Sequence, residues 1–240
     1  MGRTLIYISI IHTDPDLGSL ASDVEEKASS LLGERWEKHK KIVKQYWEEI
    51  AEYFKKREVE GVKIFQDGLP VEGKEAQVII EKLAKTGSPN YQLLKNLSNQ
   101  GACVLKTENP ALLKQEYQIT KNLVAKKNLL WSIFAFLNYK LRKDKLLKAR
   151  DEFIAKQINQ GLRYGETGIC FLGAYHEVLS KLAKDIKIVL FKNPEKVREY
   201  YKCLSSGGKT EKFKRLVYYL SEPVKNGKII NLFNYGARKP

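Results

Sequence analysis

The sequence predicts an α/β protein with a mostly parallel sheet of about five strands, helices on both faces and a helical insertion. Short apolar runs alternate along the chain with longer segments in which apolar residues recur every three or four positions. The first run, TLIYISII at 4–11, is apolar and β-branched almost throughout, which is typical of a central parallel strand. Strands that alternate with helices are joined by right-handed crossovers, so we expect most of the sheet to be parallel.

The expected strands occupy, in chain order, residues 4–11, 61–67, 102–109, 168–173 and 185–191. Helices are expected between them, with GKEAQVIIEKLAK and YQLLKNLSNQ as two shorter ones and with long helical segments at about 17–57, 111–163 and 194–221. The second long segment is expected to break near residue 148, and SSGGK at 205–209 marks a turn in the third. The tail NLFNYGARKP carries no predicted element. We expect residues 1–240 to form a single α/β domain.

The composition indicates a folded protein without a membrane span. Of the 240 residues, 43% are hydrophobic, which is enough for a sizeable core. The longest apolar stretch, NLLWSIFAFLNYKL, has about 14 residues and is interrupted by polar ones, whereas a span needs roughly 20. The apolar N-terminal stretch lacks a small-residue cleavage site, so we interpret it as the first core strand rather than a signal peptide.

Cysteine usage favours a cytoplasmic location. The three cysteines, Cys103, Cys170 and Cys203, are an odd number, widely spaced and free of any CxxC pair. Two of them lie in apolar strand-like runs. This pattern predicts buried thiols in a reducing compartment and speaks against a disulfide framework or a zinc ribbon.

The net charge of +15 is concentrated in one part of the chain. Residues 111–163 contain 12 Lys and Arg against 4 Asp and Glu. Such charge favours an anionic partner, including nucleic acid, but a solvated set of basic helices would look the same. No RNP or zinc-finger signature accompanies the charge, so both interpretations stay open.

Four of the five expected strands end in a side chain that can transfer a proton or bind a metal. These residues are His12, Asp67, Glu108 and His176, while the fifth strand ends in Phe191 and Lys192. Ligands of open α/β sheets gather beyond the carboxyl ends of the strands. The sequence therefore predicts a functional site at this edge of the sheet.

Each of these residues also has a plainer explanation. His12 precedes a Thr-Asp-Pro-Asp run that could form a turn or a helix cap, Asp67 precedes a glycine, and Glu108 precedes Asn-Pro. A strand-end His176 could equally be structural, although the Gly-Ala pair before it lets the backbone approach a neighbour closely. The remaining histidine, His39, lies among lysines in EKHKK and is expected to face solvent.

The segment RDEFIAKQI is expected to begin a helix. Asp151 and Glu152 would then lie in the first helical turn, where the helix dipole favours acidic residues, and this suffices to explain them. Arg150 has no such explanation. It is either a surface residue or a planar clamp for a carboxylate, a phosphate or one of the strand-end acids.

The order of these pieces resembles the TraB/TIKI, ChaN and erythromycin-esterase-like superfamily. The resemblance is best over 145–178, where "RD…IA..I" is followed by FLGAYH, and weaker at 4–14, where SIIHTD lacks the glycine that usually precedes the histidine. Elsewhere it rests on element order. The resemblance implies an α/β domain whose site combines the two histidines, the acidic strand ends and the arginine. Members of the superfamily include metal-dependent proteases, an esterase that opens a lactone and a haem-binding lipoprotein.

The chemistry of this residue set favours a hydrolase acting on an ester or amide. His12, Asp67, Glu108 and His176 could supply four ligands to Zn or Mn and leave a position for water, whose pKa a metal lowers towards ~7. Arg150 could stabilise an oxyanion. Without a metal, one histidine could act as general base while a carboxylate fixes its tautomer. GxSxG, HExxH, Walker and GxGxxG motifs are all missing.

Two alternatives belong to other classes of protein. One is a non-catalytic module that holds nucleic acid or another polyanion on its basic helices. The other is an interaction protein whose site has decayed, an alternative that the missing glycine before His12 keeps open.

Overall fold

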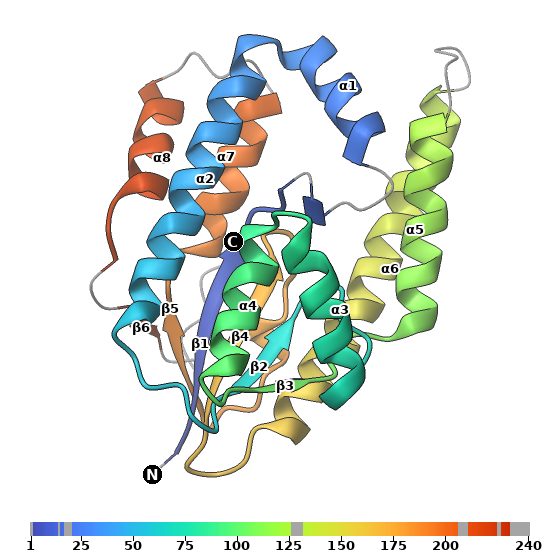
Figure 1. Ribbon diagram of the computed structural model, residues 1–240. Coiled ribbons are helices and arrows are strands. Elements are labelled where there is room, and N and C mark those ends of the chain that lie inside the picture. Colours follow the sequence, from blue (N-terminus) through green and yellow to red (C-terminus); the bar gives the residue numbers. More distant parts are fainter. Residues whose placement is uncertain are drawn as a thin grey trace.

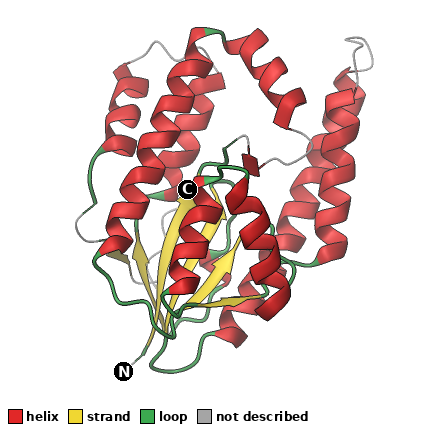
Figure 2. Cartoon of the chain, in the orientation of Figure 1, coloured by secondary structure: helices red, strands yellow, loops and turns green. Residues whose placement is uncertain are grey.

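The computed structural model describes residues 2–13, 15–16, 21–125, 132–205, 211–224 and 227–230, and Figures 1 and 2 show their arrangement. One sheet runs through the molecule with the strand order β3-β2-β4-β1-β5-β6. Its strands are β1 (Arg3–Ile10), β2 (Lys63–Gln66), β3 (Cys103–Leu105), β4 (Thr167–Gly173), β5 (Ile186–Leu190) and β6 (Lys228–Ile230).

Strands β1 to β5 are parallel, as predicted, and β6 pairs antiparallel with β5 at the edge. The α/β class expected from the sequence is therefore confirmed. The three-residue β6 was not among the expected strands. It is too short to carry a pattern of its own, and it forms by pairing with a strand that precedes it by two helices.

Helices connect the strands at nearly the predicted positions. They are α1 (Ala21–Leu32), α2 (Glu34–Lys55), α3 (Gly73–Lys85), α4 (Pro89–Asn99), α5 (Pro110–Ala125), α6 (Ser132–Gly161), α7 (Pro194–Ser205) and α8 (Glu211–Ser221), with a 3₁₀ turn η2 (Leu179–Lys181). The long segment 17–57 contains two helices because Gly33, with a φ of 51°, separates them. Most of the predicted SSGGK turn and the tail from residue 231 lie outside the described residues.

The predicted break of the long helical segment 111–163 near residue 148 is wrong. Helix α6 runs without interruption from Ser132 to Gly161, so Arg150 and Asp151 lie within it rather than at a helix start. The sequence around them is rich in Lys, Leu, Ala and Glu, which are good helix formers, and it contains no Gly or Pro that would end a helix. A first-turn dipole effect therefore cannot account for Asp151 or Glu152.

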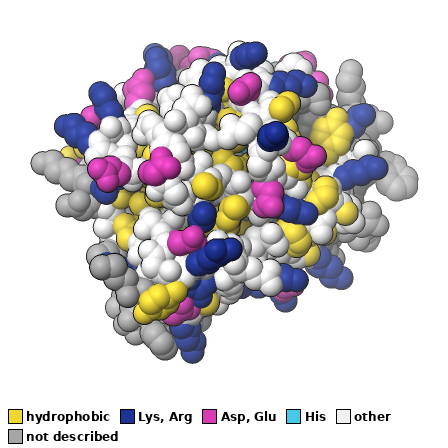
Figure 3. Space-filling view, turned by 60° about the horizontal axis from the view of Figure 1, so that its bottom comes forward, with side chains coloured by type: hydrophobic (Ala, Val, Ile, Leu, Met, Phe, Trp, Pro, Cys, Tyr) yellow, Lys and Arg dark blue, Asp and Glu magenta, His cyan; other side chains and the backbone are white. Residues whose placement is uncertain are grey.

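The surface carries basic and acidic side chains together. On the face in Figure 3, Lys and Arg side chains are interspersed with Asp and Glu and with apolar atoms. Among the described residues, no helix combines the length and the apolarity that a membrane span needs. Part of NLLWSIFAFLNYKL, residues 128–131, lies outside the described residues.

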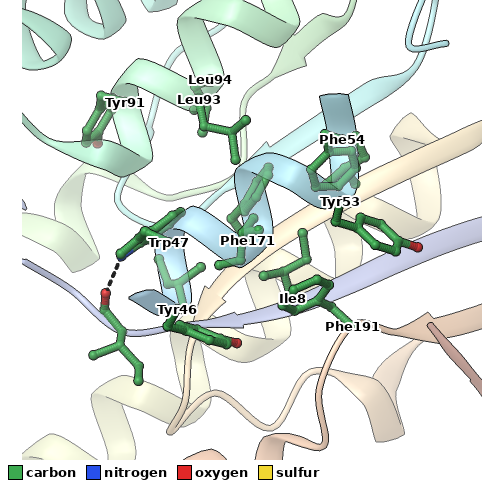
Figure 4. Packing of buried hydrophobic residues seen from close by; sticks show 14 of the residues in the cluster. Ile8, Tyr46, Trp47, Tyr53, Phe54, Tyr91, Leu93, Leu94, Phe171 and Phe191 are labelled. Carbon is green, nitrogen blue, oxygen red and sulfur yellow. Dashed lines mark hydrogen bonds between the residues drawn. The ribbon is translucent and has the colours of Figure 1, made fainter. Parts of the chain in front are cut away.

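Two apolar cores cover the two faces of the sheet. Helices α2, α3, α4, α7 and α8 contribute to one core, and α6 with η2 to the other. Figure 4 shows Tyr46, Trp47 and Phe54 of α2 packed near Ile8 of β1 and Phe171 of β4. These contacts orient the end of β1, because the Trp47 indole donates a hydrogen bond to the carbonyl of the residue that directly precedes His12, at 2.9 Å.

Cys170 is buried in the sheet, whereas Cys103 is exposed and Cys203 is half-buried; none of the three forms a disulfide. The prediction of buried thiols is therefore correct for Cys170 and wrong for Cys103. Cys103 opens β3, the edge strand, and its side chain points to the face opposite to that of the buried Val104 next to it.

The prediction that His39 faces solvent is wrong. His39 is 4% exposed in α2, its ring stacks on Trp36 with centroids 4.9 Å apart, and its Nδ1 lies 2.9 Å from the hydroxyl oxygen of Tyr200 in a hydrogen bond. The lysines on either side of it lie on the outer face of the helix. Burial lowers the pKa of His39 to about 4, so the ring is neutral at pH 7.

This burial predicts a loss of stability in mild acid. The unfolded chain takes up a proton at His39 near pH 6.5 and the folded chain only near pH 4, so the free energy of unfolding falls as the pH drops through this window. The contribution of His39 is about 3 kcal/mol. Urea unfolding of the wild type and of His39→Gln between pH 7 and pH 4 measures it, and the variant should show the smaller pH dependence. Equal slopes would contradict a neutral, buried ring.

Candidate functional site

The predicted strand-end residues lie at the carboxyl edge of the sheet. Hydrogen bonds of the backbone position the loops that carry them. The amide of Asp67 donates to the carbonyl of Phe171 at 2.9 Å, which extends the pairing of β2 with β4 by one residue. The amides of Thr107 and Glu108 both donate to the carbonyl of Leu69 at 3.1 Å and so tie the loop after β3 to the loop after β2.

The Asp67 carboxylate is the centre of the cluster. Its Oδ2 accepts a hydrogen bond from the amide of Gly173 at 2.9 Å and lies 3.3 Å from Nε2 of His176 and 3.5 Å from Nε2 of His12. Its Oδ1 accepts from Nη2 of Arg150 at 2.6 Å. The Asp67 side chain is buried, and its carboxylate joins residues at or just after the ends of β1 and β4 to Arg150 of α6.

His176 is held on its other side by Asp151. Nδ1 of the ring lies 2.6 Å from Oδ1 of Asp151, whose second oxygen accepts from the amide of Glu177 at 2.9 Å. Both side chains are buried. This hydrogen bond fixes the plane of the imidazole and leaves Nε2 directed at Asp67, an arrangement that metal-binding histidines use.

Asp67, Glu108 and His176 form a group that could hold a metal ion. Each offers one ligand atom, these atoms lie within 4.8 Å of one another, and all three residues are buried. No second group of this kind occurs in the part of the chain that the structure describes. Of the four predicted ligands, His12 falls outside the group. Its side chain is 39% exposed, and its Nε2 lies 3.5 Å from Oδ2 of Asp67, the oxygen that also faces His176.

Arg150 clamps the strand-end acids. Its Nε donates to the two carboxylate oxygens of Glu108 at 3.2 and 3.3 Å, and its Nη2 donates to both Glu108 and Asp67. Its Nη1 donates to Oε2 of Glu116 on α5 at 2.5 Å. Arg150 is only 4% exposed, so the surface interpretation of this residue is wrong. The guanidinium lies in the interior and compensates three carboxylates.

Burial and charge shift the pKa values of this cluster in different directions. Burial alone would raise the pKa of Asp67, but the charges of His176 and Arg150 outweigh it and hold the pKa well below the usual range. For Glu108 burial dominates and raises the pKa to about 7 despite its bonds to Arg150. Asp67 and Asp151 more than offset the burial of His176 and raise its pKa to about 10.

At neutral pH and without a metal, His176 is therefore an imidazolium between two carboxylates, and the buried Glu108 is protonated in part of the molecules. The pKa of His12 is also raised, since its hydrogen bond with Asp67 and the charge of that carboxylate outweigh partial burial. The site thus stores protons that a bound cation would displace.

The glycine before His176 is required by this geometry. A Cβ on Gly173 would lie 3.0 Å from Oδ2 of Asp67 and 3.3 Å from Nε2 of His12. The small residues of FLGAYH therefore let β4 approach the carboxylate, as expected from the Gly-Ala pair. The fifth strand end behaves differently, because Nζ of Lys192 donates to backbone carbonyls of Tyr219 and Glu222 near the end of α8.

Sequence reasoning missed Asp151 and Glu116 as members of the cluster. A signal for Asp151 was present, because it precedes Ile154, Ala155 and Ile158 by three, four and seven positions and so lies on the buried stripe of α6. A carboxylate on the apolar side of a helix needs a partner. Glu116 carried no comparable signal, since its side chain is 37% exposed.

Comparisons with known proteins found no family model, no curated protein and no solved structure that matches this chain. The resemblance to the TraB/TIKI, ChaN and erythromycin-esterase-like superfamily therefore stays a prediction that rests on motif order. Function has to be argued from the arrangement of the side chains.

We expect Gly173→Ala to disturb the cluster without unfolding the protein. The added methyl group must push the Asp67 carboxylate away from both imidazoles, which costs about 1–3 kcal/mol of stability and lowers the pKa of His176. NMR titration of the histidine rings and urea unfolding measure the two effects. Gly168→Ala is the matched control. Gly168 lies on the same strand as Gly173, and its Cβ would meet a methyl group of Leu5 at 3.0 Å, far from any imidazole. An unchanged His176 pKa in Gly173→Ala would contradict the close packing described here.

Proposed function

We propose that this protein is a metal-assisted hydrolase that cleaves an ester or amide at the carboxyl edge of its sheet. The observation that carries the proposal is the buried group of Asp67, Glu108 and His176, with ligand atoms within 4.8 Å of one another and with His176 oriented by Asp151. Two carboxylates and one imidazole form a ligand set that suits Mn or Zn. Three protein ligands leave coordination positions for water and substrate.

When bound, the metal would supply a hydroxide nucleophile, because it lowers the pKa of a coordinated water to ~7. The residues around it have separate tasks. Asp151 holds the tautomer and plane of His176, and Asp67 joins this imidazole to His12. His12 is the most exposed group of the cluster and its pKa is raised, which suits it to donate a proton to the leaving group of a substrate.

The sequence also suggests Arg150 as a group that stabilises an oxyanion. In the structure its Nε, Nη1 and Nη2 all donate to carboxylates, so it would have to release one of them to reach a substrate. Its contacts support a different contribution. Arg150 positions Asp67 and Glu108 and neutralises their charge inside the protein.

The alternative of a polyanion-binding module gains no specific support. Figure 3 shows acidic side chains among the basic ones on the face it displays. The side chains of residues 122–143, which include several of the lysines that make 111–163 basic, lie outside the described part of the chain. A cytoplasmic location, proposed from the odd number and wide spacing of the three cysteines, is compatible with a hydrolase of this type.

Metal binding tests the proposal directly. We expect the wild type to bind Mn²⁺ or Zn²⁺ with one ion per chain and His176→Ala to lose at least about 100-fold in affinity, since one ligand and the proton it stores are removed. Because the pKa of His176 is raised to about 10, binding should release a proton and weaken as the pH falls below that value. Calorimetry in buffers of different ionisation enthalpy measures both effects.

The hydrolase function requires more than binding. The metal-loaded protein should cleave members of a panel of chromogenic esters and amides, and a chelator should abolish the cleavage. A wild type that binds no metal, yet binds DNA or RNA tightly in a salt-sensitive way, would replace this proposal with the polyanion-binding alternative.

Asp151→Asn tests whether the orientation of His176 matters. We expect a loss of about 10- to 100-fold in metal affinity, because an amide holds the ring less strongly than a carboxylate and lowers the basicity of Nε2. Glu152→Gln is the matched control. It removes a carboxylate one position along the same helix, with a side chain that is 59% exposed and pairs only with Lys181 at 3.7 Å. Equal affinities of the two variants would remove Asp151 from the site.

A further inference from the structure

We propose that Arg150 is an internal cation that competes with a divalent metal for Asp67 and Glu108, and that Glu116 receives its guanidinium when the metal binds. The inference rests on the proposed function, since it concerns the occupancy of the same site. It assigns roles to two residues that are not ligands themselves. Metal affinity would then depend on the position of an arginine side chain.

Arg150 and a metal need the same carboxylate oxygens. The guanidinium donates to Oδ1 of Asp67 and to both oxygens of Glu108, which are two of the three side chains in the group that could hold a metal. These bonds use the carboxylate lone pairs that a metal would take. A divalent ion placed in this group would also stand beside a buried positive charge.

A guanidinium displaced by the metal needs another carboxylate partner. A buried arginine cannot be left without partners, because the desolvation of its charge would be uncompensated. Glu116 already accepts from Nη1 at 2.5 Å, and it lies on α5, which packs against α6. Its side chain is 37% exposed, whereas that of Glu108 is fully buried. Glu116 therefore offers the guanidinium a contact on the solvent side of the cluster that survives a small outward rotation.

The arginine compensates the buried carboxylates when no metal is bound. Without a metal, Asp67, Glu108 and Asp151 are three buried carboxylates near one another, and the contacts of Arg150 and His176 with them hold this cluster together. With a metal, the ion takes over that compensation. The protein can therefore fold before it is loaded, and the arginine lowers the affinity enough for the ion to exchange.

Arg150→Met and Glu116→Gln should change the affinity for Mn²⁺ in opposite directions. Arg150→Met should bind Mn²⁺ at least about tenfold more tightly than the wild type, and its melting temperature should be low without Mn²⁺ and recover with it. Glu116→Gln should bind Mn²⁺ about 5- to 20-fold more weakly, because the guanidinium loses its third carboxylate partner and stays on Asp67 and Glu108. Calorimetry with Mn²⁺ alone and thermal unfolding provide the measurements, and Glu152→Gln is the control for the loss of a nearby carboxylate.

The double variant distinguishes this relay from a general charge effect. If Glu116 acts through Arg150, then Glu116→Gln changes nothing in the Arg150→Met background, whereas a long-range effect of its charge persists there. The relay is overturned if Arg150→Met binds Mn²⁺ no more tightly than the wild type, or if Glu116→Gln behaves like Glu152→Gln. Should Arg150→Met fail to fold even with Mn²⁺, Glu116→Gln, which changes a half-exposed side chain, still decides whether the relay operates.

The outcomes also separate the relay from the proposed function. A wild type that binds Mn²⁺ through His176, combined with unchanged affinity in both variants, overturns the relay and leaves the metal site intact. A wild type without affinity for Mn²⁺, combined with binding by Arg150→Met, supports the competition and overturns the metal-assisted function of the natural chain. If no variant binds Mn²⁺, both proposals fail.

Discussion

The burial of the Asp67 carboxylate is the constraint on which the site depends. An isolated charge in this position would be costly, and the structure compensates it with a backbone amide, a guanidinium and two imidazoles. The Gly173 amide and the His176 imidazole come from the end of β4 and the loop after it, His12 follows β1, and the guanidinium comes from α6. The buried charge therefore ties these three parts of the chain together. The positions of Gly173 and Arg150 follow from the same requirement.

The strand order makes this convergence possible. In the sheet, β3, β2, β4 and β1 are consecutive neighbours, and these are the four strands that end in Glu108, Asp67, His176 and His12. Adjacent parallel strands bring their carboxyl ends to one edge within a few strand spacings. The strand beyond β1 is β5, whose Lys192 is bound to carbonyls near α8 and takes no part.

Local patterns in the sequence were sufficient for the elements and for the residues at their ends, because strand and helix periodicity and the rule for parallel sheets need no knowledge of contacts. They could not supply the contacts of α6. The pairing of Asp151 with His176 joins residues 25 positions apart, and that of Arg150 with Glu108 joins residues 42 positions apart. The same limit applies to His39, whose burial is produced by Tyr200 from α7 rather than by its lysine neighbours.

The balance of charge in the cluster argues against a purely structural role. Four carboxylates, those of Asp67, Glu108, Glu116 and Asp151, surround one guanidinium and one buried imidazole, and burial raises the pKa of Glu108 to about 7 despite its bonds to Arg150. An ion network of this kind is rarely more stabilising than apolar packing of the same volume. Its acidic excess is concentrated on oxygens that lie close to Nε2 of His176. Surplus carboxylates, an oriented imidazole and one side chain open to solvent support the proposed cation site at this edge of the sheet.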